Sequence, residues 1–302
     1  MEYTVLGRTG LRVSRLGLGG APLAGDFGSA DPREVEAMIH EALDLGVNVI
    51  DTAPRYGGGE SERRIGRALR GRRNAVILAT KAAGHNQTYD YETVTRSVED
   101  SLRRLQTDWV DLLQLHDVDS QPYELLMEEA LPALERLREQ GKVRYIGISG
   151  RNLALLMRYM RTGRYDTVQF YARYMLIDHT AKDALLPLAA ETGMGVINGS
   201  VLGLGMLADR PAPFVERDVV GEAERRMEKL AFLRRPPGAP GGLVEPGMRF
   251  SLSEPRIHVT LTGAESRSVL RMNAAFCDGR GLDPADLRRI YALFDGQPLF
   301  DP

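Results

Sequence analysis

The chain has little that would support a disulfide-bonded, zinc-binding or membrane-spanning protein. Cys277 is the only cysteine among 302 residues, which excludes an internal disulfide and a zinc site built from cysteines. A reducing compartment, the cytoplasm, is therefore the expected location. No segment approaches the ~18 uninterrupted apolar residues of a membrane span, so we expect no membrane as partner. The first residues also carry an acid and a glycine where a secretory signal needs a basic start and an apolar core.

Neither sign of charge predominates. The chain has 39 Lys and Arg residues against 41 Asp and Glu residues, a net charge of −2, so a basic surface for nucleic acid is not expected. The length would allow two average domains, but an α/β barrel of this size is one domain. We expect residues 1–302 to form a single domain that acts on a small molecule. The sequence does not indicate an oligomeric state.

What the chain does contain is a regular alternation of strand-like and helix-like segments. Two short β-like runs separated by a glycine-containing turn open the chain and predict a hairpin. Eight apolar runs follow, each preceding a segment with helical periodicity: residues 15–20, 47–51, 75–81, 109–116, 143–149, 166–172, 194–200 and 258–263. Alternating βα units predict a parallel sheet with right-handed crossovers. Eight of them at this length predict an α/β fold, a closed (β/α)8 TIM barrel with an N-terminal β-hairpin.

Two local signals refine this prediction. In the first helix, Asp31 is placed to cap the N-terminus, Pro32 suits the first helical position, and Gly46 ends the segment. The seventh unit is irregular, because residues 236–247 are rich in Pro and Gly and show no periodicity. We expect this stretch to be a long surface loop and not a domain boundary.

Polar residues end three consecutive predicted strands. Asp51, Lys81 and His116 close the second, third and fourth runs, and Tyr56 follows Asp51 just before three glycines. Taken singly, these residues would be a turn former, a solvated cation and a structural hydrogen-bonding group. In a (β/α)8 barrel, however, the active site lies at the carboxyl ends of the strands, so the four are expected to meet.

The chemistry that this set suits is proton transfer to or from an oxygen. A free tyrosine has a pKa near ~10, and a neighbouring ammonium lowers that pKa by favouring the phenolate. Lys81 would supply the ammonium, Asp51 would hold it, and His116 would orient a substrate carbonyl or hydroxyl.

These residues, in this order, resemble the aldo-keto reductase superfamily over nearly the whole chain. The segments that carry the resemblance are DTAPRYGGGESE, LATK, LLQLHD, KVRYIGIS, SVLGLGML and LTGAESRSVLRMNAA. Within the superfamily the chain is most similar to L-galactose dehydrogenases and related aldose dehydrogenases. The resemblance implies NAD(P)-dependent hydride transfer between nicotinamide C4 and the carbonyl or alcohol carbon of a small polar substrate, with an aldose oxidised at C1 to a lactone as the nearest analogy. It makes Tyr56 the acid/base, Lys81 and Asp51 its tuning pair, and His116 the substrate orienter.

The resemblance also implies a set of cofactor-binding residues. Ser149 and Gln169 would hold the carboxamide, and the remaining residues would bind the pyrophosphate and the adenosine phosphate: Ser200, Leu202, Gly203, Gly205, Gly263, Glu265, Ser266, Arg267, Arg271 and Asn273. Two positions depart from the family pattern. Gly150 stands where an Asn is common, a loss that Asn152 could make good, and Gly199 stands where many members place a Tyr or Trp against the nicotinamide.

The adenosine end favours NAD over NADP. Gly263 and Val269 occupy positions where NADP-preferring members usually have Lys or Arg, and the Glu265 carboxylate would repel a 2′-phosphate. Arg267 and Arg271 argue the other way, because they are close enough in sequence to fold back onto that phosphate. We expect NAD. The G-x-G-x-x-A pattern of residues 203–208 resembles a Rossmann fingerprint, but as the seventh unit of eight it suits the phosphate site of a barrel.

Three alternatives remain open. The first is an NADPH-dependent carbonyl reductase of a biosynthetic or detoxification pathway, and the second is a nicotinamide-binding regulatory subunit without turnover. The third is a metal-dependent barrel hydrolase using His116, Asp117, Asp119, His85 and Asp51. Against this last reading, the first strand offers no ligand and Lys81 would place a cation in the site. We expect no bound metal. Substrate choice is expected to depend on the loops after the first, third and fourth strands and on the tail of residues 296–302.

Overall fold

The protein is a closed parallel barrel. The computed structural model describes residues 1–25, 31–83, 87–234 and 241–300. Eight strands close in the order β10-β3-β4-β5-β6-β7-β8-β9, and each pairs with its neighbours in parallel. They are β3 (Leu16–Gly19), β4 (Val49–Asp51), β5 (Ile77–Ala82), β6 (Val110–Leu115), β7 (Val143–Gly150), β8 (Thr167–Tyr171), β9 (Gly195–Gly199) and β10 (Val259–Thr262). The (β/α)8 barrel predicted from the sequence is confirmed.

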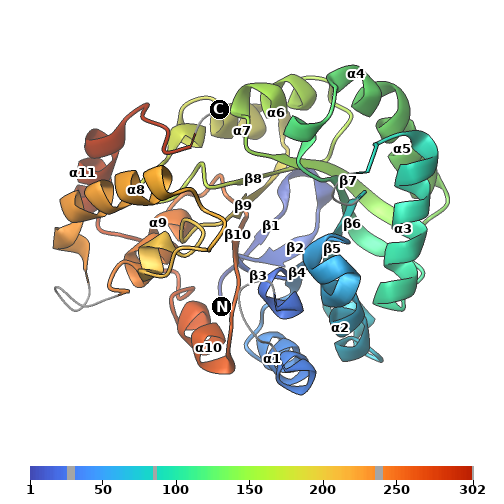
Figure 1. Ribbon diagram of the computed structural model, residues 1–302, viewed down its shortest axis with the longest axis horizontal. Coiled ribbons are helices and arrows are strands. Elements are labelled where there is room, and N and C mark those ends of the chain that lie inside the picture. Colours follow the sequence, from blue (N-terminus) through green and yellow to red (C-terminus); the bar gives the residue numbers. More distant parts are fainter. Residues whose placement is uncertain (26–30, 84–86, 235–240, 301–302) are drawn as a thin grey trace.

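Helices surround the strands (Figure 1). They are α1 (Pro32–Asp44), α2 (Glu60–Ala68), α3 (Tyr91–Leu105), α4 (Tyr123–Leu125), α5 (Leu131–Glu139), α6 (Leu153–Met160), α7 (Leu185–Thr192), α8 (Arg217–Lys229), α9 (Val244–Leu252), α10 (Arg267–Ala275) and α11 (Pro284–Phe294). The predicted start of the first helix is confirmed, because Asp31 accepts a hydrogen bond from the Arg33 N–H and Pro32 is the first helical residue.

The predicted loop at 236–247 is wrong for its last four residues, 244–247, which belong to a helix. Helix α9 begins at Val244, so its first turn contains Pro246 and Gly247, whereas residues 236–240 lie outside the described residues. A proline is tolerated there because the first-turn N–H groups have no intrahelical partner. A Cβ at Gly247 would lie 3.0 Å from Leu207 Cδ1, so the missing side chain lets the helix pack closely. Tertiary packing here overrides a sequence pattern that favours a loop.

The predicted hairpin is also confirmed, and it sits against the barrel. Strands β1 (Tyr3–Val5) and β2 (Arg12–Ser14) are antiparallel, and the turn between them is bonded to the barrel through the Arg8 N–H, which donates to the Gly193 carbonyl at 2.7 Å. Gly7 makes this approach possible: its φ is +48°, and a Cβ there would lie 2.3 Å from the Gly195 nitrogen. Gly195 begins β9, so the hairpin lies at the amino-terminal end of the barrel and leaves the opposite end free.

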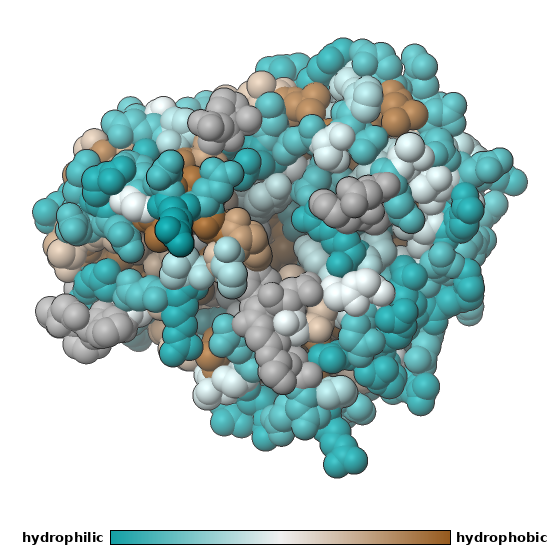
Figure 2. Space-filling view, in the orientation of Figure 1, coloured by the Kyte–Doolittle hydropathy of each residue, from teal (hydrophilic) through white to brown (hydrophobic). Residues whose placement is uncertain are grey.

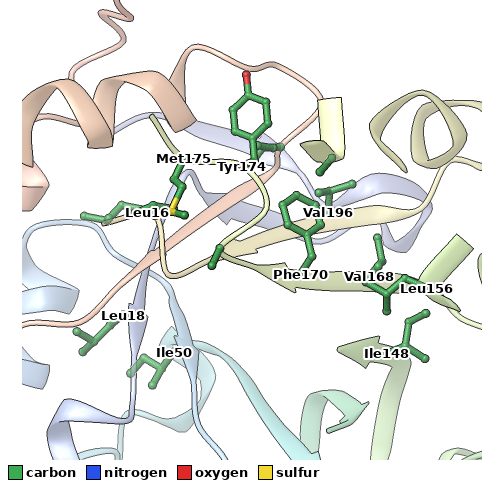
Figure 3. Packing of buried hydrophobic residues seen from close by; sticks show 14 of the residues in the cluster. Leu16, Leu18, Ile50, Ile148, Leu156, Val168, Phe170, Tyr174, Met175 and Val196 are labelled. Atoms are coloured by element: carbon green, nitrogen blue, oxygen red, sulfur yellow. The ribbon is translucent and has the colours of Figure 1, made fainter. Parts of the chain in front are cut away.

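Two hydrophobic clusters follow from the two-residue period of the strands. One lies between strands and helices, where Val168 of β8 packs near Leu156 of α6 (Figure 3). The other contains residues from several strands and the hairpin: Leu6, Leu11, Val13, Val49, Ala79, Leu112, Ile197, Val259 and Leu261. Because alternate residues of a barrel strand point inward, this second cluster fills the interior.

The residues two positions further along β4, β5 and β6 face the same interior. They are Asp51 after Val49, Lys81 after Ala79 and Gln114 after Leu112, and all three are buried. The barrel thus changes from an apolar layer to a polar layer toward its carboxyl end.

The visible face of the molecule is largely hydrophilic, with hydrophobic residues in patches between the polar ones (Figure 2). Within the described ranges, we find no helix that is both long enough and apolar enough to cross a membrane.

Candidate active site

A buried ion pair forms the base of the site. Lys81 Nζ lies 2.6 Å from Asp51 Oδ1 and donates a second hydrogen bond to the Thr52 carbonyl at 2.9 Å, and the Lys81 side chain is only 1% exposed. Burial by itself lowers the pKa of Lys81, but the Asp51 carboxylate and the Tyr56 phenol more than offset it and the pKa is raised. Burial raises the pKa of Asp51, and the Lys81 charge opposes that rise. The lysine is therefore held as an ammonium ion.

Tyr56 lies beside both Lys81 and His116. Lys81 Nζ is 5.2 Å from the centroid of the phenol ring, and the imidazole of His116 stands edge-on to that ring at 5.9 Å and 90°. The chain turns back after Tyr56 through Gly57, Gly58 and Gly59, whose φ angles are 56°, 58° and 86°. Only glycine adopts such a left-handed run readily, which explains the three successive glycines.

The pKa of Tyr56 is raised, which differs from the lowering expected from Lys81. Burial has the largest effect and raises this pKa; the Lys81 ammonium lowers it, but by less. The sequence indicated the neighbouring charge but not the depth at which the phenol sits. Tyr56 is thus a protonated phenol at neutral pH.

His116 follows β6 and is a neutral imidazole. Its pKa lies well below the ordinary value, first because it is buried and then because the Lys81 and Arg55 charges repel a further proton. Its Nδ1 is buried and has no hydrogen-bond partner among the described residues. A neutral imidazole has one donor and one acceptor nitrogen, so His116 can hydrogen-bond a substrate oxygen.

Gln114 is a member of the site that the sequence interpretation missed. Its Nε2 donates to Gln169 Oε1 at 2.7 Å and lies 3.4 Å from Asp51 Oδ2, so it links the predicted carboxamide ligand to the ion pair. The sequence does contain a signal for Gln114: it is an amide residue within an otherwise apolar predicted strand, two residues before His116.

One cavity of about 1290 Å³ extends from these residues to helix α10. Its lining includes many of the residues implied by the resemblance: Asp51, Tyr56, Lys81, His116, Ser149, Gln169, Ser200, Leu202, Gly205, Gly263, Glu265 and Asn273. At the far end, Asn273 Nδ2 donates to Thr262 Oγ1, while Asn273 Oδ1 is buried without a partner in the described part of the chain. A free acceptor of this kind fits the amino group of an adenine ring.

Four of the implied cofactor residues are absent from the described lining of this cavity. Gly203 lies against Met175: a Cβ built on Gly203 would be 3.2 Å from the Met175 sulfur. The Ser266 side chain caps α10 by accepting a hydrogen bond from the Val269 N–H at 3.4 Å.

The other two are the arginines considered as phosphate partners. They face helix α1 instead. Arg267 Nε lies 3.3 Å from Glu34 Oε2, and Arg271 Nη2 donates to Glu41 Oε2 at 3.2 Å. Both cations are thus paired with carboxylates outside the cavity.

The two departures from the family pattern have structural explanations. At position 150 a Cβ would lie 2.7 Å from Asp119 Oδ1, so glycine leaves room for that carboxylate. Asn152 does not reach the cavity, because its side chain caps α6 by accepting a hydrogen bond from the Leu155 N–H at 3.0 Å.

At Gly199, a Cβ would lie 3.3 Å from the Cβ of Tyr171 on the adjacent strand β8. Tyr171 lines the cavity and supplies an aromatic side chain next to Gly199.

The residues of the metal-hydrolase alternative do not form a ligand set in the described ranges. No group of three or more His, Cys, Asp or Glu side chains there could hold a metal ion. His85, which that alternative also used, lies outside the described residues.

A (β/α)8 barrel with a buried Lys–Asp pair beside a tyrosine and a neutral histidine, at one end of a large cavity, is arranged to transfer a proton to or from a substrate oxygen. The chain belongs to the aldo/keto reductase family, whose model matches residues 15–294. It is an NAD(P)-dependent oxidoreductase.

Individual relatives agree with this assignment. L-galactose dehydrogenase from Arabidopsis thaliana is 32% identical over 316 residues, which cover 98% of this chain and 95% of that protein. Among solved structures, the holo form of an aldo-keto reductase from Bacillus halodurans has a TM-score of 0.79 and 27% identity over 99% of each chain. An aldo-keto reductase from Klebsiella pneumoniae in complex with NADPH has a TM-score of 0.76 and 24% identity over 100% of this chain and 99% of its own, which shows the fold alone.

Proposed function

We propose that the protein oxidises an aldose at C1 to its lactone, with NAD as its cofactor. The observation that carries the proposal is the Lys81–Asp51 ion pair buried beneath Tyr56 at the edge of the large cavity. The similarity to L-galactose dehydrogenase over nearly the whole chain supports a sugar as the substrate. Because the only cysteine is a buried free thiol, the cytoplasm is the proposed location.

Each residue of the site has a role in this reaction. His116 hydrogen-bonds the substrate hydroxyl and orients it toward Tyr56. Tyr56 accepts the hydroxyl proton during oxidation in its phenolate form, and as the phenol it donates that proton during reduction. Lys81 stabilises the phenolate form of Tyr56, and Asp51 fixes the ammonium in place. The nicotinamide, when bound, supplies the carbon that accepts or releases the hydride.

The cofactor would be held along the length of the cavity. Ser149 and Gln169 are proposed to bind the carboxamide, and Asn273 the adenine. The Gln169 oxygen is engaged by Gln114 and its side chain also hydrogen-bonds Asp51, so one N–H of its amide is left as the donor for a carboxamide. Ser200, Leu202 and Gly205 are proposed to contact the pyrophosphate, with Gly203 shaping the turn and Ser266 capping the helix beside the ribose.

The preference for NAD is supported by the charges at the adenosine end. Glu265 lines the cavity there, and a carboxylate repels a 2′-phosphate but accepts hydrogen bonds from ribose hydroxyls. The cations that could offset it, Arg267 and Arg271, are paired with Glu34 and Glu41. To contact a 2′-phosphate, either arginine would have to leave or share its carboxylate partner.

Fluorescence titration with NADH and NADPH tests this preference, followed by assays of a panel of aldoses. We expect NADH to bind at least tenfold more tightly than NADPH, and lactone to form together with NADH. Glu265→Gln should reduce the difference in binding affinity between NADH and NADPH. Glu128→Gln, a substitution on the helical segment before α5, should leave that difference unchanged. Tighter binding of NADPH than NADH by the wild-type protein would contradict the cofactor assignment.

A second candidate, an NADPH-dependent carbonyl reductase, is favoured by one observation. Burial raises the pKa of Tyr56 and so favours the phenol over the phenolate, and reduction needs a proton donor. Initial rates in both directions at pH 7, with saturating NAD or NADPH, decide between the two: the proposed function predicts measurable aldose oxidation with NAD, and its absence beside rapid NADPH-dependent reduction would favour the reductase.

A further inference from the structure

An ion pair joins the two residues that flank Tyr56 and His116 in sequence. Arg55 directly precedes Tyr56, Asp117 directly follows His116, and Arg55 Nη1 donates a hydrogen bond to Asp117 Oδ2. Both residues line the large cavity, and their side chains are 34% and 18% exposed. The pair therefore lies at the mouth of the cavity, next to the two residues proposed to contact the substrate oxygen.

Asp117 is held in place by its backbone. Its φ and ψ are 45° and 63°, a left-handed conformation that few non-glycine residues adopt. Its N–H donates to Ser149 Oγ at 3.2 Å, and its carbonyl accepts from the N–H and the hydroxyl of Ser120 at 2.9 and 2.8 Å. Surroundings that impose an unfavourable conformation on a residue are common at functional sites. The Asp117 backbone is thus fixed next to His116, and its carboxylate is held by Arg55.

The chemistry of the pair suits neighbouring hydroxyl groups. An ionised carboxylate accepts about four hydrogen bonds and a guanidinium donates five, so the single contact between them leaves both with unused capacity. A hydroxyl both donates and accepts, and two adjacent hydroxyls can therefore bridge the carboxylate and the guanidinium. Because the two charges cancel, the pair does not favour an anionic substrate over a neutral one.

Two aromatic side chains line the same cavity, Tyr171 and Phe300. The Arg151 guanidinium carbon lies 5.0 Å from the centroid of the Phe300 ring. A wall that combines fixed hydrogen-bonding groups with flat apolar surface matches a sugar ring, which has hydroxyls at its edge and C–H groups on its faces.

We propose that Arg55 and Asp117 form a subsite that binds adjacent hydroxyls of a neutral, polyhydroxylated substrate. The subsite rests on the proposed function and deepens it, because it explains how the site selects a sugar over a simple aldehyde. Neither residue belongs to the Tyr56, Lys81, Asp51 and His116 set.

The test compares two aldehydes of similar size that differ in hydroxyl groups. NADH-dependent reduction of glyceraldehyde and of butanal is measured for the wild-type protein, Asp117→Ala and Arg55→Met, together with NAD-dependent oxidation of L-galactose. We expect Asp117→Ala to lower the ratio of kcat/KM for glyceraldehyde to kcat/KM for butanal at least tenfold, mainly through KM for glyceraldehyde. Asp100→Asn, which alters the exposed Arg103–Asp100 pair on α3, should leave that ratio within twofold.

If the wild-type protein oxidises L-galactose, two results with the Asp117→Ala variant would overturn the subsite but not the proposed function. One is an unchanged glyceraldehyde-to-butanal ratio with unchanged activity. The other is an equal loss of activity toward both aldehydes, which would mean that the Arg55–Asp117 pair only positions Tyr56 and His116. A wild-type protein that oxidises no aldose and reduces butanal as efficiently as glyceraldehyde would contradict the proposed function, and the subsite with it.

Discussion

The Lys81 ammonium and the Asp51 carboxylate lie 2.6 Å apart inside the barrel, from adjacent strands β5 and β4. The contact follows from strand periodicity, since each residue is two positions beyond an apolar residue of the interior cluster. If one partner of an ion pair at such depth is removed, the other charge stays buried without a counter-ion, which costs the folded protein much of its stability.

Removing one partner of this pair should therefore destabilise the protein. We expect Asp51→Asn to lower the free energy of unfolding by about 3–5 kcal/mol, because it leaves the Lys81 charge buried without a counter-ion. The double variant Asp51→Asn/Lys81→Met should lose less than the sum of the two single variants. Urea unfolding monitored by circular dichroism measures both effects. Glu139→Gln, in the exposed Arg136–Glu139 pair, is the control and should change stability by less than ~1 kcal/mol; equal effects at the two pairs would contradict the account.

Tyr56→Phe should abolish most turnover without weakening cofactor binding. The substitution removes the hydroxyl that transfers the proton, and general acid–base catalysis contributes roughly 10²–10⁴-fold in rate. Steady-state kinetics and NADH titration measure the two quantities. Tyr123→Phe, on α4, is the matched control: its ring lies outside the cavity lining, 4.7 Å from the Tyr159 ring and tilted by 31°, and the variant should retain full activity. Full activity in the Tyr56→Phe variant would rule out the assigned role.

The pH dependence of turnover should differ between the two directions. Because burial raises the pKa of Tyr56 above its ordinary value near ~10, the phenolate needed for oxidation is scarce at neutral pH and increases as the pH rises. We expect kcat/KM for oxidation to rise with pH through the alkaline range and that for reduction to fall there. Lys81→Met removes the charge that opposes this rise in pKa, so the oxidation profile should move to still higher pH. A profile that stays in place would show that Lys81 does not tune Tyr56.

Two neighbouring glycines provide a matched test of the loop that positions Tyr56. Gly57 and Gly58 both have positive φ, so alanine at either position should lose roughly 1 kcal/mol of stability from backbone strain. Only at Gly57 would the new Cβ collide, 2.7 Å from Ala24 Cβ, whereas a Cβ at Gly58 meets no described atom within 4 Å. We expect Gly57→Ala to lower kcat at least tenfold more than Gly58→Ala. Thermal unfolding together with kcat measures this difference, and equal effects would mean that the contact with Ala24 is unimportant.

The fold was predictable from the sequence because its signals are local. Eight apolar runs alternate with helical periodicity, and strand ends marked by Asp51, Lys81 and His116 share one rim of a closed barrel. The loop prediction in the seventh unit failed because of tertiary packing. Gly247 is a residue typical of loops, but here it allows α9 to pack against Leu207.

The site was only partly predictable, because a side chain's partners depend on the folded chain. The spacing of the motif placed Arg271 near the adenosine end of the cofactor site. It could not predict the pairing of Arg271 with Glu41, which lies more than 200 positions away in sequence. Tyr56 was identifiable, yet its raised pKa depends on burial that the sequence does not display. Arg55 and Asp117 lay beside recognised residues, and their contact emerged only in three dimensions.

The proposed reaction moves a hydride from C1 of an aldose to a nicotinamide. It can be followed by oxidising L-galactose that carries deuterium at C1 in the presence of NAD, and measuring the mass of the NADH formed and the isotope effect on kcat/KM. We predict that the NADH gains one deuterium and that the deuterated sugar reacts more slowly than unlabelled L-galactose. NADH without deuterium, or no NADH with any aldose, would contradict the oxidation of an aldose at C1.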